Sequence, residues 1–581
     1  MIKPSKKFKN YYLRESQKLS WKVSPKNTIK ILKNNKYKWF PDGKINLFQN
    51  CIEDHINNGL KNKVAIIIVD KNKNIKEYTY SQINSRVNSM SFYLEKVSKK
   101  ISSYKVMIQA SASIESVTLK LACAKLGLQF SVIFEDLEGS AIISRAKLFK
   151  PNIIFTRLSI KDFNKKFKNM PAIKNKCVCK EQLKKIISTY QKKKIKNKYI
   201  DSHHSLFTMF TSGSTGAPKG ITHCTGGYLL YSKLSAEKQF GMNEKSIILT
   251  VSEAGNMNGH TYSLFAPLAF GATTVLVEKP ITVTDLNLLK KLLKLKVSIV
   301  YLPVTLIRLI KATNKSIKVN KRYIKAIGSL GEHLAASVAE WFAKNFATKN
   351  TCVVNAYYQT ETAGIICSPR FNQSARDVPH GSVGKTLTNY LSINNLDDNK
   401  MREIKIITPW PGMMKGVING PKIWKKYFDK SGNFRLFDLA TIKNKNIYIH
   451  GRNDDVINIT GHRIGSEEIE SIIFRLDEVE ECSAVTIEDY LEGSKIVLFI
   501  VSQINIDKEI ERIILENFGS YAIPKKIIYV SQLPKNRSGK ILRRLLREML
   551  KTPKMNDYGE TSTILNIESL KEIKYKIMNY E

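Results

Sequence analysis

A stretch of ten residues, TSGSTGAPKG (Thr211 to Gly220), concentrates hydroxyl groups, glycines and one lysine. Glycine lets backbone N–H groups approach a ligand closely, serine and threonine add small hydroxyl donors, and lysine adds a mobile positive charge. These groups suit a polyphosphate. The stretch is not a GxxxxGK[ST] loop, because Pro218 precedes Lys219. A flexible linker is the plain alternative, but the apolar run Leu206 to Phe210 just before it favours a phosphate-binding loop.

Three later segments carry further candidate residues: YYQTETAG (Tyr357 to Gly364), GRNDDVINITGHRIGSEEIE (Gly451 to Glu470) and PKNRSGK (Pro534 to Lys540). Each alone has an ordinary explanation, because a single acid is usually a surface group and a basic run is usually a solvated face. All four together, in this order, resemble the signature of the adenylate-forming (AMP-dependent synthetase/ligase) superfamily.

Other stretches are similar to acetyl- and propionyl-CoA synthetases, namely WFPDGKINLFQNCIEDH, ITHCTGGYLLYSKL, NGHTYSLFAPLAFGATTVLVE, GSLGEHL, PWPG and YGETSTILNIESL. The resemblance implies a Mg²⁺-dependent reaction in two halves. A carboxylate attacks the α-phosphorus of ATP, which gives an acyl-adenylate and pyrophosphate. The thiol of coenzyme A then displaces AMP.

The resemblance also implies a role for each matching residue around the nucleotide. Glu361 is expected to hold Mg²⁺, since a hard cation prefers carboxylate oxygen, and Asp438 to accept the ribose hydroxyls. Two positions depart from the family, which has proline at His333 and glycine at Phe437. The residues implied to bind ATP or AMP are Thr211, Ser212, Gly213, Ser214, Thr215, Gly216, Lys219, Gly331, Glu332, His333, Asn355, Ala356, Tyr357, Tyr358, Gln359, Thr360, Asp438, Arg452 and Arg463.

The catalytic residues implied by the resemblance lie in the last third of the chain. Lys540 is expected to stabilise the charge that develops during adenylation, and Arg463 to contact the phosphate. Asp454 is expected to be the hinge about which a small domain swings between the two half-reactions. Thr460 and Gly461 are expected to line the channel for the thiol of CoA.

The acyl pocket is matched by Met257, Asn258, Leu330 and Tyr358. Tyr358 takes the place of a tryptophan that closes the pocket of acetate enzymes, so an aromatic wall is kept and a small acid is expected. Asn258 takes the place of a threonine. A polar substituent on the acid is one explanation, because a buried amide requires hydrogen-bond partners.

The residues expected on the CoA side depart more from the family. The glycine-rich and arginine-bearing stretches of the acetate enzymes are replaced by VIFEDLEG and FTRLSIKDF. Leu515 stands at about the position where the family has a C-terminal arginine. Free CoA remains the leading acceptor because the family resemblance implies it. These departures leave open the alternative that the acceptor is the pantetheine of a carrier protein or another nucleophile. A non-catalytic nucleotide-binding homologue is the second alternative.

Short apolar runs alternate with amphipathic stretches from Val64 onward, which predicts an α/β fold with parallel strands. We expect a large N-terminal adenylate-forming domain with layered sheets and helices over residues 1–452, including a polar lead-in over 1–45. A small mobile α+β domain over 453–581 is expected to end in a loosely packed polar tail from about 555.

Composition gives 43 % apolar residues and a formal net charge of +44. The cations are spread along the chain, so we favour a compositional bias over a nucleic-acid-binding face. Eight scattered cysteines do not form a zinc motif and are expected to be reduced thiols of a cytoplasmic protein. No stretch is apolar enough for a membrane span.

Overall fold

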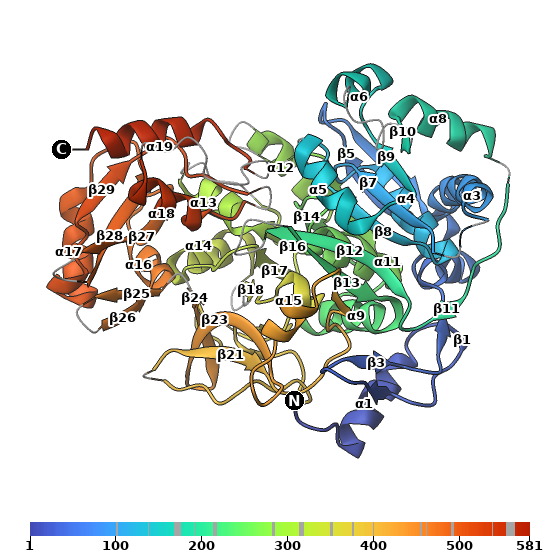
Figure 1. The fold of residues 1–581 in the computed structure, drawn as a ribbon, viewed down its shortest axis with the longest axis horizontal. Coiled ribbons are helices and arrows are strands. Elements are labelled where there is room, and N and C mark those ends of the chain that lie inside the picture. Colours follow the sequence, from blue (N-terminus) through green and yellow to red (C-terminus); the bar gives the residue numbers. More distant parts are fainter. Residues whose placement is uncertain are drawn as a thin grey trace.

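The structure is a computed structural model. It describes residues 1–581 except 100, 102, 138, 168–175, 192, 213–217, 280, 282–284, 313–318, 349–352, 375–376, 399, 454–455, 460–461, 490–492, 537–538, 554–563 and 581. Two seven-stranded sheets and their helices form the large part of the molecule, and a smaller body with its own sheet lies at the left in Figure 1.

The first large sheet has the strand order β10-β9-β7-β8-β12-β13-β22. The first five strands in this order, β10, β9, β7, β8 and β12, run parallel to one another. β13 is antiparallel to both of its neighbours, β12 and β22. Its strands are β7 (Lys105–Gln109), β8 (Gln129–Ile133), β9 (Ile153–Thr156), β10 (Cys177–Val178), β12 (Ser205–Ser212), β13 (Pro218–Cys224) and β22 (Gly416–Val417). The nearby helices are α3 (Tyr80–Ser98), α4 (Ile114–Leu126), α5 (Gly139–Phe149), α6 (Ile160–Lys166), α8 (Lys180–Thr189) and α9 (Thr225–Phe240).

The second large sheet has the order β18-β17-β16-β14-β15-β5-β6, and only β6, at its edge, is antiparallel. Its strands are β5 (Val64–Val69), β6 (Ile75–Thr79), β14 (Ile247–Thr250), β15 (Thr273–Val277), β16 (Ile299–Pro303), β17 (Ala326–Leu330) and β18 (Val353–Asn355). The helices that follow them include α10 (Met257–His260), α11 (Ala266–Ala269), α12 (Leu286–Leu293), α13 (Val304–Ala312) and α14 (Ala336–Phe346).

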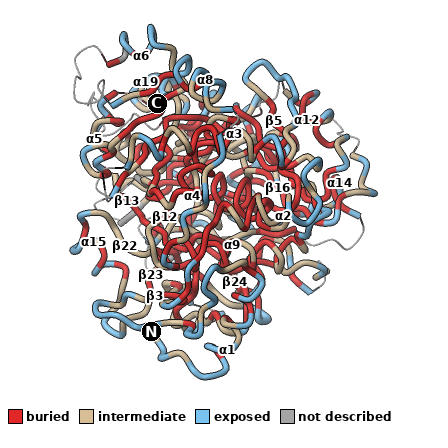
Figure 2. The backbone as a smooth tube through the Cα atoms, turned by 90° about the vertical axis from the view of Figure 1, so that its right-hand side faces the viewer, coloured by how far each residue is buried: buried red, intermediate tan, exposed pale blue. Residues whose placement is uncertain are grey.

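Inner strands such as β5, β15 and β16 are nearly continuous apolar runs because both of their faces are covered, and Figure 2 shows the buried interior. Helix ends are fixed locally. Thr79 and Gln82 form a capping box that starts α3. Gly127 takes φ +63° after α4, a left-handed conformation that glycine adopts without strain.

The N-terminal segment is more ordered than its polar composition predicts. α1 (Lys6–Ser16) turns Phe8 and Tyr12 into the main core, and Trp39 packs on both rings. The remaining elements are α2 (Asp54–Asn57), β1 (Trp21–Val23), β2 (Ile29–Ile31), β3 (Tyr37–Trp39), β4 (Lys44–Ile45) and β11 (Ile200–Asp201). A few aromatic residues are therefore sufficient to attach a polar segment to the fold.

A third layer and the C-terminal part complete the chain. An antiparallel sheet has the order β21-β23-β24 and lies below the large sheets in Figure 1. The elements of this region are β19 (Cys367–Ser368), β20 (Lys385–Thr386), β21 (Arg402–Ile406), α15 (Pro421–Lys426), β23 (Phe434–Lys443) and β24 (Asn446–Arg452). The C-terminal elements are β25 (Val456–Ile459), β26 (His462–Gly465), α16 (Ser466–Ile473), β27 (Glu481–Asp489), β28 (Gly493–Val501), α17 (Asp507–Phe518), β29 (Lys526–Tyr529), α18 (Arg543–Lys551) and α19 (Ser569–Met578).

The predicted fold class is confirmed, with a large α/β part and a smaller C-terminal α+β part. The end of the chain departs from the expected loose tail, because α19 buries Ile573 in the same hydrophobic cluster as Leu546 of α18 and Ile528 of β29. Among the described residues no helix has the length and apolarity to cross a membrane, and no described cysteine forms a disulfide.

Candidate active site

A cavity of about 720 Å³ lies where the large part of the chain meets the C-terminal part. β14, β17 and β18 point their carboxyl ends toward it, since the segments that follow these parallel strands line its wall. Ligands of open α/β sheets bind at this edge. The predicted residues that line the cavity are Thr211, Lys219, Met257, Asn258, Leu330, Gly331, Glu332, His333, Asn355, Ala356, Tyr357, Tyr358, Gln359, Thr360, Glu361, Asp438, Arg452 and Lys540.

Several predicted residues lie outside the described part of the chain: Gly213, Ser214, Thr215 and Gly216, the hinge residue Asp454, and Thr460 and Gly461. Only the backbone is described for Ser212, which ends β12, and for Arg463, which lies in β26. Thr211 and Lys219 flank the glycine-rich stretch and are directly paired across β12 and β13. Both line the cavity, so this stretch connects two cavity-lining ends.

The carboxylate of Asp438 is held by three side chains. Its Oδ2 accepts hydrogen bonds from Tyr357 Oη at 2.6 Å and from Gln359 Nε2 at 2.7 Å. Arg452 Nη1 lies 3.6 Å from its Oδ1. Burial raises the pKa of Asp438, and the Arg452 guanidinium and these hydrogen bonds oppose that rise. The arrangement fixes a polar acceptor at the wall of the cavity.

Phe437 occupies the position at which the family has glycine, and the structure gives a reason for that glycine. The φ of Phe437 is +59°, in the left-handed region that a bulky side chain rarely adopts. Its ring lies 4.7 Å from the Arg435 guanidinium and 5.6 Å from that of Arg452. These cation–π contacts, each worth about 0.5–2 kcal/mol, offset part of the backbone strain.

Glu361, the predicted magnesium ligand, accepts a hydrogen bond from Tyr427 Oη at 2.6 Å. No group of three or more potential metal-ligating side chains occurs among the described residues. A single carboxylate nevertheless fits Mg²⁺, which proteins usually hold through one or two carboxylates plus the substrate's phosphates. Tyr427 follows α15 outside every recognised motif, so the sequence offered no signal for its role.

The backbone carbonyl of Thr360 contacts the ring of a buried histidine, His223. His223 Nε2 lies 2.8 Å from the Thr360 carbonyl oxygen, and only a protonated Nε2 can donate to it. Burial lowers the pKa of His223 to about 4, so the ring is neutral at physiological pH. His223 was not predicted from the sequence. Its contact with the Thr360 carbonyl oxygen fixes the backbone between Gln359 and Glu361.

The predicted acyl residues lie at one end of the cavity. Tyr358 packs edge-on against Tyr262 with ring centroids 6.1 Å apart. Asn258 is buried, and its Nδ2 donates to Thr250 Oγ1 at 2.9 Å and to Ser263 Oγ at 3.3 Å. No described residue forms a hydrogen bond with its Oδ1. The end of the cavity is therefore aromatic, with one amide oxygen lacking a protein partner.

Lys540 reaches the cavity from a tight loop of the C-terminal part. Its backbone N–H donates to Asn536 Oδ1 at 3.0 Å, and Asn536 N–H donates back to the Lys540 carbonyl oxygen at 2.9 Å. Gly539 takes φ +86°, and a Cβ there would lie 3.0 Å from Thr305 Oγ1 of α13. Glycine therefore allows the loop both to turn and to approach the large part closely.

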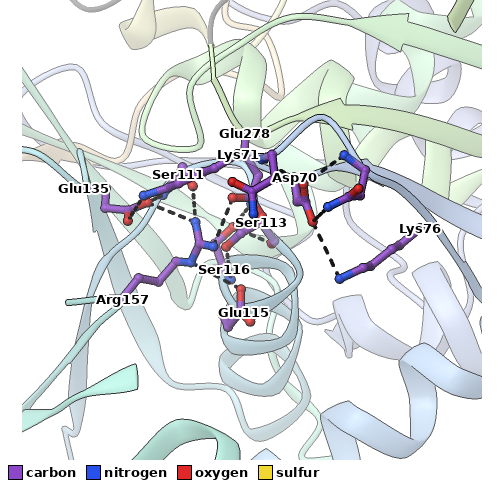
Figure 3. A network of polar contacts seen from close by, with 12 residues as sticks. Asp70, Lys71, Lys76, Ser111, Ser113, Glu115, Ser116, Glu135, Arg157 and Glu278 are labelled. Atoms are coloured by element: carbon purple, nitrogen blue, oxygen red, sulfur yellow. Dashed lines mark hydrogen bonds and ion pairs between the residues drawn. The ribbon is translucent and has the colours of Figure 1, made fainter. Parts of the chain in front are cut away.

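The two stretches that depart from the family on the expected CoA side meet in one polar network (Figure 3). Arg157 pairs with Glu135 at 3.0 Å, Glu278 at 3.0 Å and Glu115 at 3.4 Å, and Lys71 pairs with Glu135 at 2.5 Å. A second cavity of about 330 Å³ beside it is lined by Lys71, Glu135, Arg157, Leu158, Ser159, Asp162, Lys180, Glu181 and Lys184. Leu515, the third position at which the chain departs from the family on the expected CoA side, is half exposed on α17.

The AMP-binding enzyme family matches residues 53–428, and its C-terminal domain matches residues 468–540. The chain belongs to the AMP-binding enzyme family. This membership confirms the predicted adenylate-forming class, and its matched regions contain most of the cavity wall and Lys540.

Curated relatives of this family member include an acetyl-coenzyme A synthetase of Helicobacter pylori strain P12, 29 % identical over 96 % of this chain and 91 % of the relative. One of Cupriavidus necator is 29 % identical over 93 % of this chain and 89 % of the relative.

Two solved structures share the fold. An acetoacetyl-CoA synthetase from Streptomyces lividans has a TM-score of 0.82 at 15 % identity, over 99 % of this chain and 92 % of that one. An anthranilate CoA ligase in complex with anthranoyl-AMP has a TM-score of 0.76 at 19 % identity, over 86 % and 96 %.

Glu467 of α16 also lines the cavity but was not assigned from the sequence. Its carboxyl carbon lies 3.4 Å from where a Cβ on Gly451 would be, and no described residue hydrogen-bonds its Oε2. Burial raises the pKa of Glu467 from 4.5 to about 7, which the Arg543 guanidinium opposes. Glu467 therefore stays protonated in the folded protein up to about pH 7.

The Glu467→Gln variant should change how stability depends on pH. The stability that Glu467 contributes is present below about pH 4.5 and is lost as pH rises to about 7, because ionisation costs more in the folded than in the unfolded state. Relative to the unsubstituted protein, the variant should gain stability across that window and then stay level. Urea unfolding midpoints at half-unit pH steps measure this, with exposed Glu511→Gln as the control. A difference that does not vary with pH would contradict the assignment.

Proposed function

We propose that this chain is an AMP-forming acid–thiol ligase that activates a small carboxylic acid as acyl-AMP and transfers it to coenzyme A. The single observation that carries the proposal is that Lys540, from the C-terminal part, lines the same cavity as Asp438 and Glu361. The names of the curated relatives, acetyl-coenzyme A synthetases, support the reaction class.

In the proposed first half-reaction, the acid's carboxylate oxygen attacks the α-phosphorus of ATP and the bond to the pyrophosphate oxygen breaks. Thr211 and Lys219, with Ser212, Ser214 and Thr215, hold the β- and γ-phosphates, and Thr360 contacts the α-phosphate. Glu361 holds Mg²⁺, which neutralises phosphate charge when bound. Asp438 and Arg452 hold the ribose, and Gly331, Glu332 and His333 line the adenine side.

Lys540 and Arg463 are assigned to the transition state of this step. An ammonium near the attacking carboxylate and the α-phosphate stabilises the charge that develops there. In the second half-reaction the CoA thiol attacks the acyl carbon, AMP leaves, and Thr460 and Gly461 line the thiol's path. We assign the domains to 1–452 and 453–581, with Asp454 as the hinge between them.

The acid is proposed to be small, in the range of acetate and propionate, because Tyr358 closes the pocket end with a ring packed on Tyr262. The unpartnered Asn258 Oδ1 favours an acid that also carries a hydroxyl or amino donor, since an unmade buried hydrogen bond costs about 1–3 kcal/mol. A simple aliphatic acid leaves that cost in place.

The acceptor has one alternative that a specific observation favours. Arg157 is engaged by three carboxylates, so it is not arranged to bind the 3′-phosphate of CoA. Lys180 and Lys184 line the adjacent cavity and offer point charges for a phosphate. If they do not serve, the same adenylate is transferred to the pantetheine of a carrier protein or to another nucleophile.

The function is tested by acid-dependent pyrophosphate exchange with acetate, propionate and butyrate and with glycolate, lactate and 3-hydroxypropionate. We expect exchange with the small acids, preference for the hydroxylated partner of a pair, and AMP release on adding CoA. Exchange without CoA-dependent turnover indicates the carrier-protein alternative. No exchange with any acid, despite ATP binding, indicates a non-catalytic nucleotide-binding homologue.

The Lys540→Ala variant should separate the half-reactions. We expect pyrophosphate exchange to fall by about 10²-fold or more, because a charge that acts in the adenylation transition state is removed. Thioester formation from supplied acyl-AMP and CoA should persist. Lys508→Ala, an exposed lysine of α17, is the matched control. Equal loss of both steps would show that Lys540 has a general structural role.

The Tyr358→Gly variant should accept longer acids, because it removes the ring that closes the cavity end. kcat/KM should fall for propionate and rise for hexanoate, while KM for ATP stays within about twofold. Exchange rates across a C2–C8 series measure the change. An unchanged chain-length preference would place the acyl pocket elsewhere.

A further inference from the structure

Glu332 lies at the junction of the large and C-terminal parts, where its two carboxylate oxygens serve different partners. Its Oε2 lies 3.0 Å from Arg308 Nη1 of α13, and its Oε1 accepts a hydrogen bond from the backbone N–H of Ile541 at 3.0 Å. Ile541 directly follows Lys540. One carboxylate thus connects a helix of the large part to the loop that carries the lysine.

Arg308 makes this connection from a nearly buried position. Its side chain is 9 % exposed and that of Glu332 12 %. The guanidinium also donates through Nη2 to the His333 carbonyl oxygen at 3.2 Å and lies 4.2 Å from the ring centroid of Phe474, in the C-terminal part. Arg308 therefore orients Glu332 and contacts the C-terminal part itself.

The surroundings show why the carboxylate needs this arginine. A carboxylate at 12 % exposure loses much of its hydration, and without a cation its charge would be costly. Arg308 supplies the opposite charge at 3.0 Å, and a hydrogen bond to a charged acceptor is roughly twice as strong as one to a neutral acceptor. The Ile541 N–H donates to this carboxylate one residue after Lys540.

We infer that Arg308 and Glu332 form a positioning pair that docks the Lys540 loop over the cavity and so sets the geometry of adenylation. The inference rests on the proposed function, because it concerns the step assigned to Lys540. Neither side chain need touch the reacting atoms. The pair acts through the backbone of Ile541 and the ring of Phe474.

The test compares Arg308→Met with Lys311→Ala. Lys311 lies one turn further along α13 and also bridges to the C-terminal part, through Asp477 at 2.6 Å, but Asp477 is 79 % exposed. An exposed pair of this kind contributes little. Arg308→Met should lower pyrophosphate exchange by at least about tenfold, with thioester formation from supplied acyl-AMP nearly unchanged. Lys311→Ala should leave both rates unchanged.

Two further variants guard against a general loss of folding. Arg308→Lys retains the charge and should restore part of the exchange. Arg308→Met combined with Glu332→Met leaves no unpaired buried carboxylate, so it should fold better than Arg308→Met alone yet still lack exchange. In a Lys540→Ala background, Arg308→Met should cause no additional loss. Equal loss of both half-reactions, or an additive effect with Lys540→Ala, would overturn the inference.

A readout without catalysis separates this inference from the proposed function. Hydrogen–deuterium exchange of a peptide covering residues 539–545 should speed up at the Ile541 amide in Arg308→Met and in Glu332→Ala, and not in Lys311→Ala. If the unsubstituted protein activates no acid but shows this pattern, the pair stands and the proposed function fails. Fast exchange at Ile541 in the unsubstituted protein would mean that no such docking occurs.

Discussion

The structure depends on one constraint: groups from distant parts of the chain must meet around a single anionic ligand. Parallel strands meet this constraint, because the segments that follow β14, β17 and β18 all leave the same edge of one sheet. Asp438 joins them from β23 and Lys540 from the C-terminal part. A cavity of about 720 Å³ results, and no single element could supply its charges. The apolar cores serve mainly to hold these strand ends in register.

Basic side chains outnumber acidic ones at the wall of the cavity, which suits an anionic ligand. The acidic residues are Glu332, Glu361, Asp438, Glu467 and Glu470, and the basic residues are Lys219, Arg308, Lys426, Arg452, Lys540, Arg543, Arg544 and Arg547. Burial raises the pKa of Asp438 and of Glu467, because a carboxylate charge is costly away from water. The general excess of cations over the rest of the chain adds attraction at longer range.

Sequence was most informative where chemistry requires fixed residue types at fixed spacing. The four motifs predicted the family, and the family resemblance predicted 18 of the 40 residues that line the cavity. Alternating apolar runs predicted the α/β fold. Sequence failed where a role depends on a neighbour distant in the chain. Tyr427 supports Glu361 and Arg308 supports Glu332, yet neither lies in a motif, because any donor that reaches those carboxylates would serve. The tail was expected to pack loosely, and the N-terminal segment was predicted only as a polar lead-in. Phe8, Tyr12 and Ile573, which attach these segments to the fold, are too few to change the composition, although each is buried.

The contacts around Glu332 can hold the C-terminal part against the large part without preventing the two parts from separating. The buried ion pair with Arg308 lies wholly within the large part, so it need not break if the C-terminal part moves. At Glu332 and Arg308 the polar contacts that cross are one backbone hydrogen bond to a carboxylate, about 1.5–3 kcal/mol, and one cation–π contact, about 0.5–2 kcal/mol. Elsewhere Lys311 pairs with Asp477 at 2.6 Å, His450 lies 2.6 Å from Glu468, and Ser337 Oγ donates to the Phe474 carbonyl oxygen at 3.1 Å. Apolar packing crosses as well, because Ile307 and Phe342 share a hydrophobic cluster with Ile469 and Phe474. Such packing is not directional, so it favours contact between the two parts without specifying one orientation. The charged acceptor at Ile541 supplies the direction, and its modest strength is compatible with the proposed swing of the C-terminal part between the two half-reactions.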